Sequence, residues 1–112
     1  MQAKFDHVAF VVKDVAEAVG FYNATFDGVE VLYLDESWAF ISVDGMKIAF
    51  VIESQHPPHL AMRIDDKSQF EAEAMRHGKK VSVHRDLSES FYFNDPSGNM
   101  IEVMYYPKNY KL

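Results

Sequence analysis

Cysteine is absent from the 112 residues of the sequence. This absence excludes disulfide scaffolds, zinc ribbons, thiolate nucleophiles and iron–sulfur clusters, so any metal must be held by nitrogen and oxygen atoms. The chain also lacks an apolar run of the roughly 18–20 residues that a membrane-spanning helix needs, and its N-terminus lacks the apolar core of a signal peptide. We therefore expect a cytoplasmic protein with no membrane partner.

Basic residues are also scarce. Eleven lysines and arginines stand against 17 aspartates and glutamates, which gives a net charge of −6. This charge repels phosphate backbones, so we expect no nucleic acid partner. The apolar fraction of 48% is that of an ordinary globular protein. The length predicts a single domain, residues 1–112.

A repeat organises the chain. The same interval separates His7 from His59 and Asp14 from Asp66. Each block reads as a strand that runs directly into a helix, because the aspartate is a typical helix N-cap and a glutamate or glutamine follows three residues later. The sequence therefore predicts two strand–helix units that begin in the same way.

Three strands are predicted after each helix, because apolar runs alternate there with turn residues. The turns are Asp44-Gly45 in the first half and Asp95-Pro96-Ser97-Gly98 in the second. The predicted strands are Val29–Leu34, Trp38–Val43, Met46–Glu53, Lys80–His84, Ser90–Asn94 and Asn99–Tyr105. The result is an α+β domain of two βαβββ modules, at about residues 4–54 and 58–106, joined by a proline-containing linker at about 55–58.

Three residues at related positions of the repeat are candidate metal ligands: His7, His59 and Glu102. Alignment of the turn glycines makes Ala49 the counterpart of Glu102. The first strands of two symmetric halves tend to meet near their axis, which would bring both histidines together beside these two positions. Two imidazoles and one carboxylate leave about three positions of an octahedral divalent ion open. Such an ion can chelate two substrate oxygens and stabilise negative charge on one of them.

Each ligand assignment has a structural alternative. A histidine on an apolar strand face is more often a hydrogen-bonded core residue than a ligand. A buried carboxylate is harder to explain without a cation, because its burial is costly. The other histidines lack support from the repeat: His56 lies in the linker, His77 at a helix C-terminus and His84 before a loop. We expect these three at the surface.

This pattern resembles the vicinal oxygen chelate superfamily, which includes glyoxalase I, fosfomycin-resistance enzymes, extradiol dioxygenases, methylmalonyl-CoA epimerase and bleomycin-resistance proteins. The resemblance rests on Phe5-Asp6-His7-Val8-Ala9, on the histidine of the fifth strand, and on Asp95-Pro96-Ser97-Gly98 followed four residues later by Glu102. It implies a glyoxalase-like pair of curved half-barrels completed by homodimerisation. It also implies a divalent metal (Mn, Ni, Fe or Zn) on His7, His59 and Glu102, with His7 supplied by the partner subunit in many relatives.

Departures from the family pattern narrow the expected activity. Ala49 stands where glyoxalase I enzymes typically have a glutamate and the epimerases a glutamine or glutamate, so we do not expect lactoylglutathione lyase activity. Ser90 and Tyr92 match the serine and tyrosine that help to hold the phosphonate in fosfomycin enzymes. Ala9 replaces the threonine of those enzymes, and their potassium-binding loop has no counterpart, so fosfomycin is not the expected substrate.

Four side chains are predicted to serve the substrate. Arg63 could pair with an anionic group, or it could form a salt bridge at the strand end. Tyr92 could be a catalytic donor to an oxyanion or a general acid, or it could simply bond to the backbone. Ser90 and Trp38 are assigned to substrate binding, although core packing would also explain Trp38.

Two functions are compatible with this sequence. The first is a metal-dependent lyase or isomerase, transferase or dioxygenase that acts on a small molecule through adjacent oxygens. The second is a metal-free protein, similar to bleomycin-resistance proteins, that sequesters a small hydrophobic or aromatic ligand.

Overall fold

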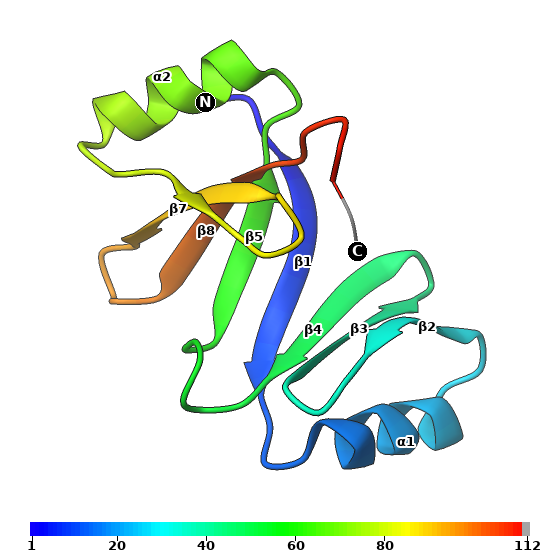
Figure 1. The fold of residues 1–112 in the computed structure, drawn as a ribbon. Coiled ribbons are helices and arrows are strands. Elements are labelled where there is room, and N and C mark those ends of the chain that lie inside the picture. Colours follow the sequence, from blue (N-terminus) through cyan, green and yellow to red (C-terminus); the bar gives the residue numbers. More distant parts are fainter. Residues whose placement is uncertain (111–112) are drawn as a thin grey trace. The chain divides into compact units, whose positions relative to one another are not determined.

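The computed structural model describes residues 1–110, which form two helices and eight strands in the order that the repeat predicts (Figure 1). The elements are β1 (Lys4–Val11), α1 (Val15–Thr25), β2 (Val29–Leu34), β3 (Trp38–Val43), β4 (Met46–Val51), β5 (His59–Arg63), α2 (Lys67–Arg76), β6 (Ser82–Val83), β7 (Glu89–Asn94) and β8 (Met100–Tyr105). The predicted α+β class with a repeated βαβββ order is confirmed. No helix among the described residues is long and apolar enough to cross a membrane.

The strands follow the order β2-β3-β4-β1-β5-β8-β7-β6 in one sheet. β3 lies antiparallel between β2 and β4, and β1 is parallel to β4. Phe40 of β3 pairs with Ala49 of β4, and Tyr92 of β7 pairs with Glu102 of β8. Ala49 and Glu102 therefore occupy equivalent positions in the two halves, as the alignment of the turn glycines predicted.

β6 differs most from its predicted extent, because it comprises only Ser82 and Val83. It is the last strand in the order and pairs only with β7 among the described strands. Both residues are exposed, so this strand buries little apolar surface. A short strand at an edge also leaves few unpaired backbone groups for aggregation.

Internal contacts divide the chain into two compact units. One unit is His7–His59, and the other combines Met1–Asp6 with the chain from Leu60 onward. β1 therefore begins in one unit and ends in the other, and the unit boundary also follows the first residue of β5.

The His7–His59 unit packs α1 against one face of its strands (Figure 1). Val15 and Val19 of the helix contact Ala39 and Ile41 of β3 and Phe50 of β4, and all five are buried. Because side chains alternate along a strand, the neighbours Phe40 and Ala49 point to the opposite face. The helix thus leaves that face available to other functions.

The second unit has its own apolar core. Phe70 and Ala74 of α2 pack with Ile64, with Phe91 of β7 and with Val103 of β8. Alternation again places the neighbours of Phe91 and Val103 on the opposite face of these strands. Those neighbours include Tyr92 and Glu102, so the polar residues of interest lie away from α2.

Both helices begin at the predicted capping aspartates. Asp14 accepts a hydrogen bond from the backbone N–H of Glu17 at 2.9 Å, and Asp66 accepts one from Gln69 at 2.9 Å. Each carboxylate satisfies an N–H group that has no partner within the helix. The shared start of the two repeats is therefore a shared capping interaction.

Replacement of either cap by alanine is expected to lower the free energy of unfolding by about 1 kcal/mol, because one backbone donor loses its acceptor. Urea denaturation of Asp14→Ala and Asp66→Ala measures this loss. Asp14→Asn and Asp66→Asn should retain most of the stability, because the amide oxygen still accepts. Equal losses in the alanine and asparagine variants would contradict the capping role.

Candidate metal centre

The two predicted histidine ligands lie side by side in the His7–His59 unit. Their rings meet edge to face, with 5.6 Å between the ring centroids. Only 6% of His7 and 8% of His59 is exposed. The sequence-based expectation that the repeat brings these imidazoles together is thus met within this unit.

The orientation of His59 is set by a backbone contact. Its Nδ1 lies 3.0 Å from the carbonyl oxygen of Pro57. A carbonyl can only accept, so Nδ1 carries the hydrogen and the ring lone pair is on Nε2. Metal-binding histidines usually have such a partner on their second nitrogen.

Glu102 is the centre of a polar network in the other unit. Tyr92 donates a hydrogen bond from its hydroxyl to Oε2 of Glu102 at 2.9 Å. Nε2 of His84 lies 3.5 Å from the same oxygen and 2.5 Å from Oγ of Ser90. Glu102 is only 4% exposed, so these polar side chains replace water around its carboxylate.

The prediction that His84 lies at the surface is wrong. Its side chain is only 29% exposed and is directed to Ser90, Tyr92 and Glu102. The cause is the loop after β6, in which the N–H of Leu87 bonds to the carbonyl of His84 and Leu87 adopts a positive φ of 74°. The alternation of residues along a strand does not predict this tight turn. It does predict that Ser90 and Tyr92 lie on one face of β7, and this is the face that His84 contacts.

The other two histidines differ in exposure. His77 is exposed, as predicted, and its ring stacks on Phe93 with centroids 4.9 Å apart. His56 is half-buried, and its ring centroid is 6.1 Å from that of His59. The linker histidine is therefore less exposed than predicted and stands beside a candidate ligand.

Tyr92 bonds to a side-chain carboxylate rather than to the backbone. Burial raises the pKa of Tyr92 well above its ordinary value, and the charge of Glu102 raises it further. The phenol consequently keeps its proton at neutral pH and can donate to Glu102 throughout the physiological range. This arrangement suits a residue that orients the carboxylate.

The donor set of His7, His59 and Glu102 fits a divalent metal. All three side chains are buried, and together they could hold a metal ion; the described residues contain no other such group of three. Imidazole nitrogens with one carboxylate oxygen suit first-row divalent ions. A cation would also offset the cost of burying the carboxylate.

Arg63 adopts the structural alternative predicted for it. Its Nε donates to Oδ1 of Asp65 at 3.1 Å, and its Nη1 lies 3.7 Å from Oδ1 of the buried Asp6. The side chain therefore has two acidic neighbours within its own unit. Its predicted contact with the substrate stays a prediction.

The remaining predicted substrate residues have different surroundings. Ser90 is fully buried beside His84. Trp38 is half-buried, and its ring stacks on Tyr33 with 4.5 Å between the centroids. Trp38 is thus the better placed of the two to meet a ligand directly.

Ala49 occupies the position in the first half of the repeat that corresponds to Glu102 in the second, so a fourth metal ligand is absent there. It is buried in a cluster with Ala9 and Phe40, which are its register partners on β1 and β3. No donor atom is available from these side chains. The half of the repeat that contains Ala49 therefore offers apolar contacts where the other half has Glu102.

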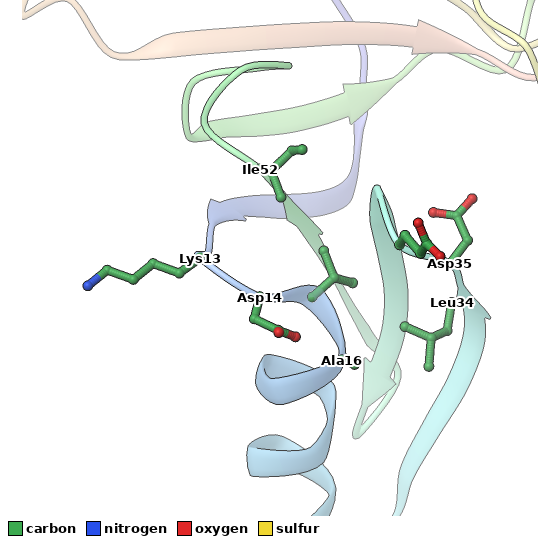
Figure 2. Close-up of a pocket in the computed structure, with 8 residues that line it drawn as sticks. Lys13, Asp14, Ala16, Leu34, Asp35 and Ile52 are labelled. Atoms are coloured by element: carbon green, nitrogen blue, oxygen red, sulfur yellow. The ribbon is translucent and has the colours of Figure 1, made fainter.

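A surface hollow beside the start of α1 holds none of the predicted site residues (Figure 2). Its lining is Lys13, Asp14, Val15, Ala16, Leu34, Asp35, Glu36 and Ile52. Asp14 caps α1, and Asp35 accepts hydrogen bonds within the turn between β2 and β3. We therefore assign the chemistry to the buried polar residues and not to this hollow.

Comparison with known proteins identifies the family. The model of the Glyoxalase/Bleomycin resistance protein/Dioxygenase superfamily matches residues 4–103. The chain belongs to this superfamily. The resemblance to vicinal oxygen chelate proteins is thereby confirmed. Among curated protein sequences, none matches the chain.

Solved structures of this superfamily share its fold. Methylmalonyl-CoA epimerase from Mycobacterium tuberculosis is similar with a TM-score of 0.68 and 18% identity, over 94% of this chain and 89% of that one. The Streptomyces coelicolor epimerase has a TM-score of 0.71 and 16% identity over the whole of both chains. A superfamily member from Vibrio splendidus has a TM-score of 0.65 and 11% identity, over 93% of this chain and 98% of that one. At these identities the likeness concerns the fold.

A tyrosine near the C-terminus provides a pH-dependent contribution to stability. Tyr106 donates a hydrogen bond from its hydroxyl to Oδ2 of Asp6 at 2.7 Å. Burial and the Asp6 charge raise the pKa of Tyr106 far above its ordinary value, and burial raises the pKa of Tyr110 to about 12. The folded protein therefore retains these protons at a pH where the unfolded chain has lost them.

Stability should consequently fall as the pH rises above about 10, by up to about 1.4 kcal/mol per pH unit for each such tyrosine. Urea denaturation between pH 8 and pH 11 measures this slope. Tyr106→Phe should be less stable than the wild type at pH 8 but should lose stability less steeply above pH 10. A slope identical to that of the wild type would contradict the role of Tyr106.

Proposed function

We propose that the protein is a metal-dependent enzyme in which His7, His59 and Glu102 hold a divalent ion and the substrate is a small molecule with adjacent oxygen atoms. The main support is that these three buried side chains could hold a metal. Family membership supports the same proposal. One structural neighbour is a methylmalonyl-CoA epimerase in complex with methylmalonyl-CoA, which is consistent with a small-molecule substrate here.

A divalent ion bound there would act as a Lewis acid toward a substrate oxygen. The chain's own residues prepare the ligands for this role. The carbonyl of Pro57 accepts from Nδ1 of His59 and so directs the Nε2 lone pair away from the backbone. Tyr92 donates to Oε2 of Glu102 and restricts the rotation of the carboxylate. Manganese, nickel, iron(II) and zinc all accept this donor set.

Ala49 limits the type of reaction. An alanine can neither bind a metal nor accept a proton, and its neighbours Ala9 and Phe40 cannot replace that function. Proton transfer by a second carboxylate at this position is therefore absent. We accordingly favour a transferase or dioxygenase activity over a lyase of the glyoxalase I type, with a homodimer in the cytoplasm as the working assembly.

Metal analysis of protein purified without a histidine tag tests the proposal. We expect about one divalent ion per chain, because a preformed set of three ligands favours binding. His59→Ala should lose the metal, whereas the matched variant of an exposed histidine, His77→Ala, should retain it. Absence of metal, together with an unchanged melting temperature after addition of Mn²⁺, Ni²⁺, Fe²⁺ or Zn²⁺, would overturn the proposal and favour a metal-free binding protein.

Removal of the Tyr92 hydroxyl tests whether this residue positions the carboxylate. Tyr92→Phe should weaken metal binding by about 10- to 100-fold, because a ligand loses the hydrogen bond that orients it. Competition with a fluorescent chelator measures the dissociation constant. Tyr105→Phe, on the strand that carries Glu102, is the control and should bind metal as the wild type does. An unchanged metal affinity in Tyr92→Phe would contradict the role of Tyr92 in positioning Glu102.

A further inference from the structure

Lys47 lies on the same sheet face as the candidate ligand His7. The two residues are register partners on the parallel strands β4 and β1, so their side chains point to the same side. This is the face opposite to α1. Ser42 of β3 and Glu30 of β2 continue the row, and the next row contains Ala9, Ala49 and Phe40. A polar row beside His7 is thus followed directly by an apolar one.

The ammonium group of Lys47 is held on this face by an aromatic ring. Its Nζ lies 5.7 Å from the centroid of Phe40. The lysine ion pairs among the described residues are those of Lys4 with Asp65 and of Lys67 with Glu89, so Lys47 has no acidic partner there. In a protein with a net charge of −6, a half-buried lysine without an ion pair among the described residues is available to an anionic ligand.

Trp38 supplies a fixed aromatic surface on the same face. Its indole stacks on Tyr33 at an interplanar angle of 23°. Asp35 accepts from the Tyr33 hydroxyl and from the backbone N–H groups of Ser37 and Trp38, the latter two at 2.7 and 3.0 Å. These hydrogen bonds lower the pKa of Asp35, so the acceptor stays charged. Both rings are consequently oriented before any ligand arrives, which reduces the entropy lost on binding.

We propose that Lys47 and Trp38 form a subsite for a planar aromatic carboxylate, in which Lys47 pairs with the carboxylate and Trp38 contacts the ring. This defines the substrate class of the function proposed above and rests on that function only for the role of His7. A singly charged carboxylate matches the single ammonium group. Phe40 lies in the row between the two groups, with its ring centroid 5.7 Å from Nζ of Lys47 and 5.8 Å from the centroid of the Trp38 ring. The other side chains of that row, Ala9 and Ala49, are small.

The sequence provides a direct probe, because Trp38 is the only tryptophan. Its indole N–H gives one signal in a ¹H–¹⁵N correlation spectrum of the full chain. We expect benzoate to shift this signal saturably and to bind about tenfold more tightly than the neutral isostere benzamide, since a charge-assisted contact is lost in the amide. Lys47→Gln should reduce the affinity for benzoate to that for benzamide, whereas Lys47→Arg should preserve most of the preference.

Lys13→Gln, which removes an exposed lysine of the same unit, is the matched control and should bind benzoate as the wild type does. Equal affinities for benzoate and benzamide, a lack of any saturable shift, or an unchanged preference in Lys47→Gln with an unchanged circular dichroism spectrum would each overturn the subsite.

Metal content measured on the same samples separates the two proposals. Lys47-dependent benzoate binding in a protein that takes up no metal supports the subsite and overturns the enzyme. Bound metal without benzoate binding supports the metal site and overturns the subsite.

Discussion

The cost of burying the Glu102 carboxylate constrains the rest of the candidate site. An isolated charge at 4% exposure would be strongly destabilising, so the neighbouring strand and loop must supply polar partners. β7 does so through Tyr92, which is the register partner of Glu102, and the loop after β6 does so through His84. Hydrogen bonds of this kind reduce the cost but leave the negative charge in place. A cation bound by Glu102 would balance that charge.

The two halves of the repeat have the same scaffold and different chemistry. Where the second half has Tyr92 opposite Glu102, the first has Phe40 opposite Ala49. The polar pair suits the support of a metal ligand, and the apolar pair suits contact with the carbon skeleton of a substrate. The two halves therefore differ most at the paired positions of β3 and β4 in the first half and of β7 and β8 in the second.

Much of this organisation could be predicted from the sequence because it depends on local rules. Capping residues and turn glycines fix where elements begin and end, and the interval between His7 and His59 exposes the duplication. His84 escaped prediction because its direction depends on the backbone of Leu87, which has no sequence signature. Arg63 could not be resolved either, since strand alternation gives the side of a residue and not its partner.

The passage of β1 from one unit into the other has a consequence for folding. Asp6 and Tyr106, which share a buried hydrogen bond, belong to one unit but stand 100 residues apart in the chain. This unit cannot be completed until nearly the whole chain has been synthesised, and contacts of such long sequence separation slow folding. Cleavage of the chain in the linker at about residues 55–58 would also place Asp6 and Tyr106 on different fragments. The duplicated halves are therefore not independent modules, because a fragment that begins after the linker lacks the Met1–Asp6 segment of its unit.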